Sequence, residues 1–237
     1  MNKFIKIQLF FVLFTGFSSL AIADGSPVNV SISASLQPSH WEGENLNGGT
    51  TFESDATQTQ LALNISKGKF YGGLSFQGAE YDFSGGAPNK VSKTTSVQDD
   101  DATIQRGEFD LVFGYYFLPQ ISFFIDFKTI ENNWKNDPYS LRYKGAGFGA
   151  NGHYPINKDW VAIGSIGFMR LDIKANGESI GDGRGSALSV GALYRINPQA
   201  NFSIRLKAQH NEYDFDEGSE QDHDIGGLVF GFGYAIQ

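Results

Sequence analysis

A period-two alternation of apolar and polar residues is the feature that most constrains the fold of this chain. Val28, Val30 and Ile32, for example, are interleaved with Asn29 and Ser31. Because successive side chains of a β-strand point to opposite faces, such a run predicts a strand with one apolar face. Runs of this kind recur, and no segment after residue 23 reaches the ~18 consecutive apolar residues that a membrane-spanning helix needs. The sequence therefore predicts an all-β protein.

We count ten alternating segments, with eight or twelve strands as the alternatives. The composition, with 29 glycines and only 7 prolines, suits short strands joined by tight turns. The segments are 28–36, 57–66, one that opens at Phe70, 103–117, one from Ile121 to Lys128, 140–154, 160–174, one from Leu188 to Arg195, one from Phe202 to Gln209, and 228–237.

Three further features favour a transmembrane barrel over a soluble β-sandwich. Short turns near 67, 119, 156 and 198 contrast with stretches of about twenty residues at 37–56 and 83–102, as inner turns and outer loops do in such barrels. The opposite face from the apolar one bears charges that a sandwich core would not tolerate. The apolar face has aromatic residues near the short turns, namely Tyr115, Phe117, Tyr154, Phe202 and Tyr234. We expect a closed antiparallel up-and-down β-barrel with its apolar side outward and five loops outside.

The amino terminus predicts export. Two lysines precede an apolar run at 7–20, and the tripeptide 21–23 is Ala-Ile-Ala, the small-x-small pattern of signal peptidase sites. We expect cleavage after Ala23, which leaves residues 24–237 as a single barrel domain. Loss of the two lysines takes the net charge from −8 to −10, and this balance argues against nucleic acid as a partner.

The last predicted strand, Leu228 to Gln237, has alternating aromatic residues. By this strand and by its general pattern, the mature sequence resembles the small bacterial outer-membrane barrels of the OmpA-like and OmpX-like kind. The resemblance implies a location in the bacterial outer membrane, contact with its lipid, and insertion by the barrel assembly machinery. The chain departs from that pattern by ending in Ile236-Gln237 and by exceeding the roughly eight strands of those barrels.

Charges on the non-aromatic face predict a polar lumen. If the turn at 118–120 is a symmetric hairpin, Asp110 lies opposite Lys128, and we predict an ion pair between them. The full set expected to face inward is Glu108, Asp110, Asp126, Lys128, Arg170, Asp172, Arg195, Arg205 and Lys207. This set is either a salt-bridge network that plugs the lumen or a polar ladder for ions and small solutes. A plug is favoured, because barrels of about eight strands are filled by side chains and open pores appear at about sixteen.

Arg142 and Lys144 share the parity of the outward-facing Phe148 and Tyr154. At about 3.4 Å per residue and a tilt of ~40°, they lie roughly 26 to 31 Å above Tyr154, at the top of the ~25 Å apolar band. We expect them to contact lipopolysaccharide phosphates, with two solvated rim cations as the alternative.

The fifth predicted loop is rich in carboxylates, and Asp214, Asp216 and Asp222 are weak candidates for a divalent cation. Their spacing does not match a calcium loop, so we expect a solvated acidic surface with neither a metal ion nor a cofactor.

No catalytic motif is evident. The chain has no cysteine, and we find no serine elbow, phosphate loop or zinc motif. The ten-stranded omptin proteases carry acidic and histidine residues above the membrane, but Asp222 and His223 are adjacent here, so their side chains should point apart. We expect a non-enzymatic barrel that acts through exposed loops, by contact with an extracellular partner or in envelope stability. A narrow, porin-like passive channel is the alternative.

Overall fold

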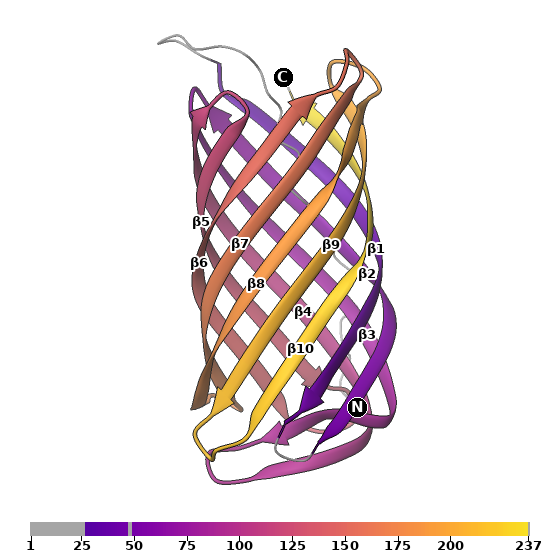
Figure 1. Cartoon of the computed structure of the whole chain (residues 1–237), viewed down its shortest axis with the longest axis vertical. Helices are drawn as coiled ribbons and strands as arrows, with labels where there is room; N and C mark the ends of the chain where they lie inside the picture. The colour runs from indigo at the N-terminus through magenta and orange to yellow at the C-terminus, as the bar shows by residue number, and fades with distance from the viewer. Residues whose placement is uncertain (1–26, 47–48, 237) are drawn as a thin grey trace, which may run out of the picture.

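The computed structural model describes residues 27–46 and 49–236, which form a closed barrel of ten antiparallel strands (Figure 1). The strands are β1 (Asn29–Asn45), β2 (Thr50–Lys67), β3 (Phe70–Val91), β4 (Ser96–Leu118), β5 (Ile121–Trp134), β6 (Ser140–Pro155), β7 (Trp160–Ala175), β8 (Glu178–Arg195), β9 (Ala200–Phe215) and β10 (Glu220–Ile236). Each strand pairs with its neighbours in sequence, and β1 pairs with β10 to close the sheet. The predicted fold class and strand number are confirmed.

Two expectations concern the amino terminus and membrane-spanning helices. The predicted signal peptide, residues 1–23, lies outside the described residues. Within the described part of the chain, no helix is both long and apolar enough to cross a membrane.

The two stretches expected to be long loops are strands instead. Residues 37–56 belong mostly to β1 and β2, and residues 83–102 mostly to β3 and β4. At this hairpin end, drawn at the bottom of Figure 1, the strands from β3 onward are separated only by residues 92–95, 135–139, 176–177 and 216–219, and β1 ends at Asn45 while β2 begins at Thr50. The expectation of long loops is wrong because the outward positions of these stretches are polar, so the apolar alternation that marks the rest of each strand is missing there.

The outer face of the other half of the barrel, toward the short turns, is apolar. Outward side chains run from Phe109 to Phe117 on β4 and from Ile121 to Phe127 on β5. The β4 stretch, nine residues long, matches the 9–11 residues that a tilted strand needs to cross a bilayer, at about 3.3 Å per residue, and the β5 stretch is shorter, at seven residues. We call this zone the membrane belt. Its last large outward residues before the hairpin end are Leu36, Leu61, Phe76, Phe109, Phe127, Phe148, Phe168, Leu188, Leu206 and Leu228.

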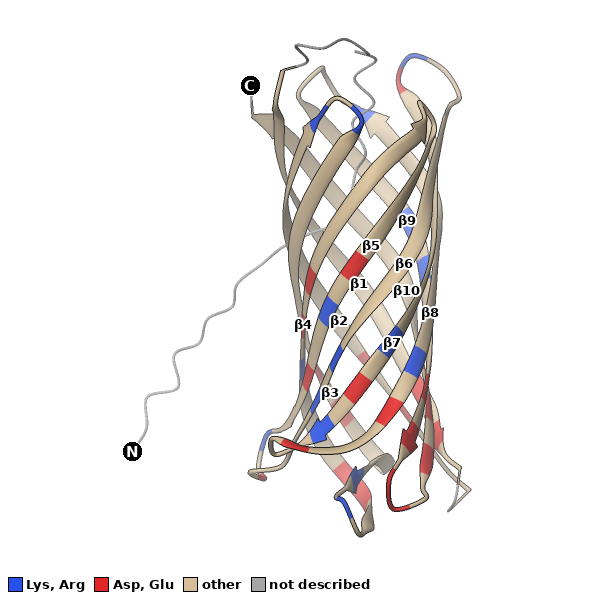
Figure 2. Cartoon of the chain, turned by 90° about the vertical axis from the view of Figure 1, so that its left-hand side faces the viewer, with Lys and Arg blue, Asp and Glu red and all other residues tan. Residues whose placement is uncertain are grey.

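Beyond the membrane belt the polarity of the wall is reversed. On β7, Leu171 and Ile173 are buried inside the barrel, whereas Asp172 and Lys174 are exposed outside. Figure 2 shows the charged residues concentrated from the middle of the barrel to the hairpin end. We call this part the extension. Its apolar interior and polar surface indicate that it is exposed to aqueous solvent.

Aromatic and aliphatic side chains fill the interior of the extension. Trp41 lies at its centre and packs edge-on against Tyr81 and Phe83, with ring centroids 4.9 and 5.2 Å away. We call this cluster the extension core, and it contains Trp41, Phe52, Tyr81, Phe83, Ile104, Ile130, Trp134, Leu141, Tyr143, Leu171, Ile173, Tyr213, Phe215 and Ile225. Because these side chains are almost completely buried, they pack the interior of the extension and stabilise it.

His223 is buried within the extension core. Its ring lies 4.8 Å from that of Tyr213 and 5.2 Å from that of Phe52, and its Nε2 shares a 3.1 Å hydrogen bond with Oε1 of Gln221. Burial, together with the nearby Arg106 guanidinium, holds the pKa of His223 well below its ordinary value.

We predict that His223→Gln reduces the loss of stability in acid. A histidine in the unfolded chain titrates near pH 6.5, whereas His223 stays neutral in the folded protein to lower pH. Its contribution is therefore fully present above about pH 6.5 and is lost as the pH falls below that value. Between about pH 7.5 and about pH 5, the urea-unfolding midpoint should fall less in the variant than in the wild type.

His210 offers a matched control with the opposite sign. It lies outward on β9, beyond the membrane belt, where partial burial lowers its pKa but hydrogen bonds to Asp224 and Glu212 raise it further, for a net increase. Its stabilising contribution is present below about pH 6.5 and is lost as the pH rises through the raised pKa. In His210→Gln, the urea-unfolding midpoint should therefore fall more than in the wild type as the pH is lowered. If His223→Gln had the same pH dependence of stability as the wild type, the buried position of His223 would not have the predicted effect.

Candidate functional site in the lumen

Charged side chains of β4 and β5 form a chain of alternating sign where the membrane belt meets the extension. Arg106 Nη2 lies 2.8 Å from Glu108 Oε1, and Lys128 Nζ lies 3.1 Å from Glu108 Oε2 and 2.5 Å from Asp110 Oδ1. The turn after β4 sets the register so that Asp110 is directly across from Lys128, as predicted. These side chains are 2–14% exposed. We call Arg106, Glu108, Asp110 and Lys128 the charge layer.

Neutral side chains complete the charge layer and join it to the extension core. Arg106 Nη1 donates a 3.2 Å hydrogen bond to Asn132 Oδ1, and its guanidinium lies 5.1 Å from the centre of the Trp41 ring. On the other wall, Gln77 donates to Gln58 and accepts a 3.5 Å hydrogen bond from Lys207. The polar charge layer and the apolar extension core therefore lie one after the other along the lumen.

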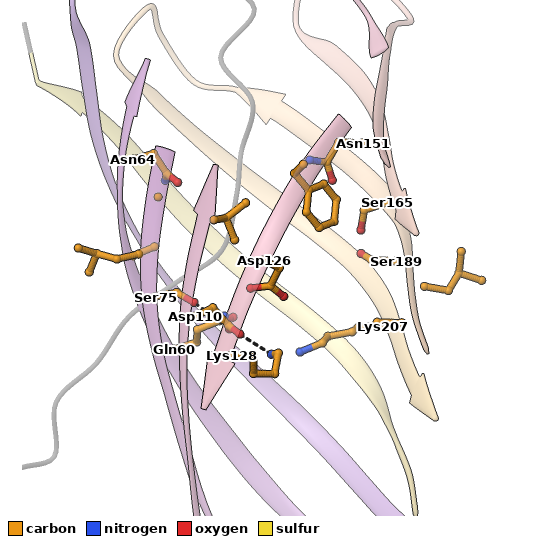
Figure 3. A pocket seen from close by; sticks show the side chains of 17 residues that line it. Gln60, Asn64, Ser75, Asp110, Asp126, Lys128, Asn151, Ser165, Ser189 and Lys207 are labelled. Atoms are coloured by element: carbon orange, nitrogen blue, oxygen red, sulfur yellow. Dashed lines mark hydrogen bonds and ion pairs between the residues drawn. The ribbon is translucent and has the colours of Figure 1, made fainter. Parts of the chain in front are cut away.

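A cavity of about 160 Å³ lies on the short-turn side of the charge layer (Figure 3). Asp126, Lys128 and Lys207 extend their charged ends into it. Both amide atoms of Asn64 and one carboxylate oxygen of Asp126 are buried there without a hydrogen-bond partner in the described residues. Buried polar atoms of this kind require water or a polar solute, and the cavity has room for either.

A second cavity, of about 60 Å³, lies nearer the short turns. Arg205 and His153 contribute to its lining. Asn151, Ser165 and Ser189 line both cavities, so the two adjoin one another. The half of the lumen within the membrane belt is therefore polar and partly hollow, in contrast to the packed extension.

Of the other charged residues expected in the lumen, some face inward, one lies at the mouth and two lie on the outer surface. Arg205 and Lys207 face inward on β9, as expected. Arg195 has inward parity but ends β8, and its Nη1 donates a 3.4 Å hydrogen bond to the carbonyl oxygen of Lys158, so it lies at the mouth. Arg170 and Asp172 were expected inside, but the structure places both on the outer surface. They lie beyond the membrane belt, where the reversed polarity turns apolar side chains inward.

Arg142 and Lys144 are exposed on the outer face of β6, just beyond the membrane belt. Arg142 Nε lies 2.6 Å from Glu131 Oε1, and Lys144 is opposite Asp172 in the strand register. Further outward cations on β7 and β8 extend this group. We call the set the basic arc, and it consists of Arg142, Lys144, Arg170, Lys174 and Arg184.

The weak candidates for a metal site do not converge. Asp214 and Asp222 face outward on β9 and β10, and Asp216 lies in the turn between these strands. Across residues 27–46 and 49–236, no group of three or more histidine, cysteine, aspartate or glutamate side chains is arranged to hold a metal ion. Asp222 and His223 lie on opposite faces of β10, as the alternation predicts.

Arg106 is the functional side chain that the sequence analysis missed. It has the same parity as Glu108 and Asp110, so the alternation of β4 contains the signal that would have found it. The contribution of Trp41 to the plug was also missed, because its strand segment was taken for a loop.

Comparisons with known proteins support the fold. Neither the protein-family comparison nor the comparison with curated proteins gives a match to this sequence. Among solved structures, the outer membrane protease OmpT from Escherichia coli is similar, with a TM-score of 0.52 and 13% identity over 93% of this chain and 100% of that chain. The translocator domain of the autotransporter NalP from Neisseria meningitidis gives 0.49 and 9%, covering 89% of this chain and 90% of that chain. The P. putida toluene transporter TodX gives 0.33 and 9%, covering 93% and 92%.

At these identities the similarity concerns the fold alone, which is that of an outer-membrane β-barrel. One fold can serve unrelated functions, so the barrel does not by itself select a function.

We predict that Lys128→Met strongly destabilises the protein. The change leaves Glu108 and Asp110 without their shared cation in a buried setting, and removing one partner of a buried pair costs about 3–5 kcal/mol. Urea unfolding of the refolded barrel measures this loss. The combined variant Lys128→Met, Asp110→Asn should recover part of it, because one of the two stranded charges is removed as well.

Lys135→Met is the matched control. Lys135 pairs with Glu80 on the surface, where the two side chains are 47% and 40% exposed, so its loss should change stability little. Equal losses in the Lys128 and Lys135 variants would show that the charge layer is not a coupled buried network.

Proposed function

We propose that this chain is an integral protein of the bacterial outer membrane, exported with residues 1–23 as its signal peptide. In this proposal it is closed to diffusion and acts non-enzymatically through the surface of its extension, in contact with an extracellular partner or in envelope stability. Its partners in the membrane are lipid and lipopolysaccharide, and the barrel assembly machinery inserts it. It needs no cofactor.

The observation that carries this proposal is the continuous filling of the lumen beyond the membrane belt. Trp41, Tyr81 and Tyr143 are 0% exposed, and Arg106 and Glu108 beneath them are 3% and 5% exposed. A solute that enters from the short turns would have to displace a buried salt-bridge network and then a packed aromatic cluster. Each of these barriers is costly, because charges and apolar side chains must both be exposed.

The extension supplies the surface through which such a protein would act. Our expectation from sequence assigned this role to long loops, but the strands themselves continue beyond the membrane belt and carry the exposed charges. A rigid sheet presents its side chains at fixed positions, which favours contact with an ordered partner.

Lipopolysaccharide is the partner that fits the basic arc. Arg142, Lys144 and Arg170 lie on adjacent strands directly beyond Phe148 and Phe168, at the height expected for the phosphates of the outer leaflet. Arginine and lysine are the side chains that bind phosphate most strongly.

The double variant Arg142→Gln, Lys144→Gln should bind lipopolysaccharide less tightly than the wild type. Each cation near a charged lipid surface contributes about 1 kcal/mol, so we expect affinity to fall roughly tenfold or more. Titration of lipopolysaccharide into the detergent-solubilised protein, followed by its effect on thermal unfolding, measures the change. Lys158→Gln, an 89% exposed lysine in a short turn, is the control and should behave like the wild type. Unchanged binding in the double variant would exclude the basic arc as the contact.

Planar-bilayer recording tests the closed lumen against the alternative of a narrow channel. We expect the wild type to insert without conductance. Replacement of the plug side chains, as in Arg106→Ser, Trp41→Gly, Tyr213→Gly, should create conductance and so shows that inserted protein is being observed. Reproducible single-channel conductance of the wild type that drops when Arg205 or Lys207 is neutralised would favour the channel.

A further inference from the structure

Arg205 is a buried cation without a carboxylate partner in the described residues. The residue is 4% exposed, and its Nε has no hydrogen-bond partner there. The ion pairs of the lumen use Arg106 and Lys128 instead, and none within residues 27–46 and 49–236 includes Arg205. A buried, unpaired guanidinium is unfavourable, so its presence requires an explanation beyond packing.

The fold makes space for this side chain. Arg205 is opposite Gly191 in the register of β8 and β9. A Cβ atom on Gly191 would lie 2.6 Å from Cγ of Arg205 and 2.1 Å from the backbone oxygen of Ile204, so no larger residue fits. The arginine stem lies over the glycine, and this places the guanidinium against the smaller cavity instead of against a neighbouring side chain.

The charged groups around the two adjoining cavities leave an excess of positive charge toward the short turns. Lys207, two residues along β9, faces the larger cavity with Asp126 as the carboxylate on the opposite wall. Arg195 at the mouth and His153 on β6 are the other titratable basic groups at this end. Asp110 is already paired with Lys128. Asp126 can balance only one of the three cations Arg195, Arg205 and Lys207. The region therefore keeps an excess of positive charge that attracts anions.

Neutral polar groups line the cavity beside the guanidinium. Hydroxyl and amide groups of Ser122, Asn151, Ser165 and Ser189 line the same small cavity. The Asn151 amide donates to Tyr71 Oη at 3.1 Å, and this hydroxyl shares a 3.0 Å hydrogen bond with Ser122, so that wall is held in place. A planar fork of guanidinium donors with nearby hydroxyls is the arrangement that recognises carboxylate and phosphate oxygens.

We propose that the two cavities form a binding site for a small oxyanion of the carboxylate or phosphate class, with Arg205 as its principal ligand and Lys207 as a second cation. The anion enters from the short-turn end, because the charge layer and the extension core close the other end. The cavity of about 60 Å³ next to Arg205 has room for a group of the size of acetate or inorganic phosphate. This site is independent of the surface role proposed for the extension.

Calorimetric titration of the refolded, full-length protein in detergent tests the proposal, with acetate and inorganic phosphate as separate probes. Ionic strength is held constant with sodium chloride, whose anion has no oxygen atoms for the guanidinium fork to bind. We expect saturable binding of at least one probe by the wild type. Arg205→Gln should weaken it about tenfold or more, since it removes a charge-assisted hydrogen-bond pair.

Three further variants separate binding from folding. Lys135→Gln removes a 47% exposed lysine that pairs with Glu80 near the hairpin end, outside both the basic arc and the cavities, and should bind like the wild type. Arg205→Lys keeps the charge but loses the fork, and Lys207→Gln keeps Arg205 intact, so both should bind with intermediate affinity. Variants are compared only after heat-modifiable gel migration shows that they are folded. Absence of saturable binding by the wild type, or equal binding by the wild type and every folded Arg205 and Lys207 variant, would overturn the proposal.

Discussion

The hydrogen-bonding demand of the backbone is the constraint on which the rest of this structure depends. A chain that crosses hydrocarbon must satisfy every peptide N–H and C=O internally, and strands can do so only if their sheet closes. Pairing of β1 with β10 provides that closure. Once the sheet is closed, successive residues of a strand alternate between the outer face and the lumen. Closure by ten strands also leaves a lumen narrow enough for side chains to fill, so inward residues must fit one another.

The strands extend beyond the membrane belt, and this determines where polar and apolar residues lie. Within the belt the outside is apolar and the lumen is polar. In the extension the outside contacts water and the lumen is packed like the core of a soluble protein. The charge layer lies where the membrane belt meets the extension, and Lys128 forms ion pairs there with both Glu108 and Asp110. Neither a simple pore nor a simple soluble barrel has this pattern, which places the two cavities on the short-turn side of the charge layer and the packed core on the other side.

The sequence predicts correctly those parts of the structure where a strand has the same environment along its length, with lipid outside and a polar lumen inside. The alternation identifies ten strands and the inward face of β9, and hairpin symmetry places Asp110 opposite Lys128. It fails where the environment changes along a strand. Arg170 and Asp172 were assigned to the lumen because apolar residues were assumed to face outward throughout, and residues 83–102 were taken for a loop for the same reason. The empty space beside Arg205 depends on side-chain packing between β8 and β9, which alternation cannot reveal.

The change of environment along single strands is the central claim, and spin-label accessibility on β5 tests it most directly. The chain has no cysteine, so single cysteines can be introduced and labelled without background. The outward positions Phe123, Ile125 and Phe127 should be more accessible to oxygen in lipid bilayers, whereas Glu131 and Asn133 should be more accessible to a water-soluble nickel chelate. Oxygen preference that continues through Asn133, or nickel preference at Ile125, would contradict an apolar belt that ends near Phe127.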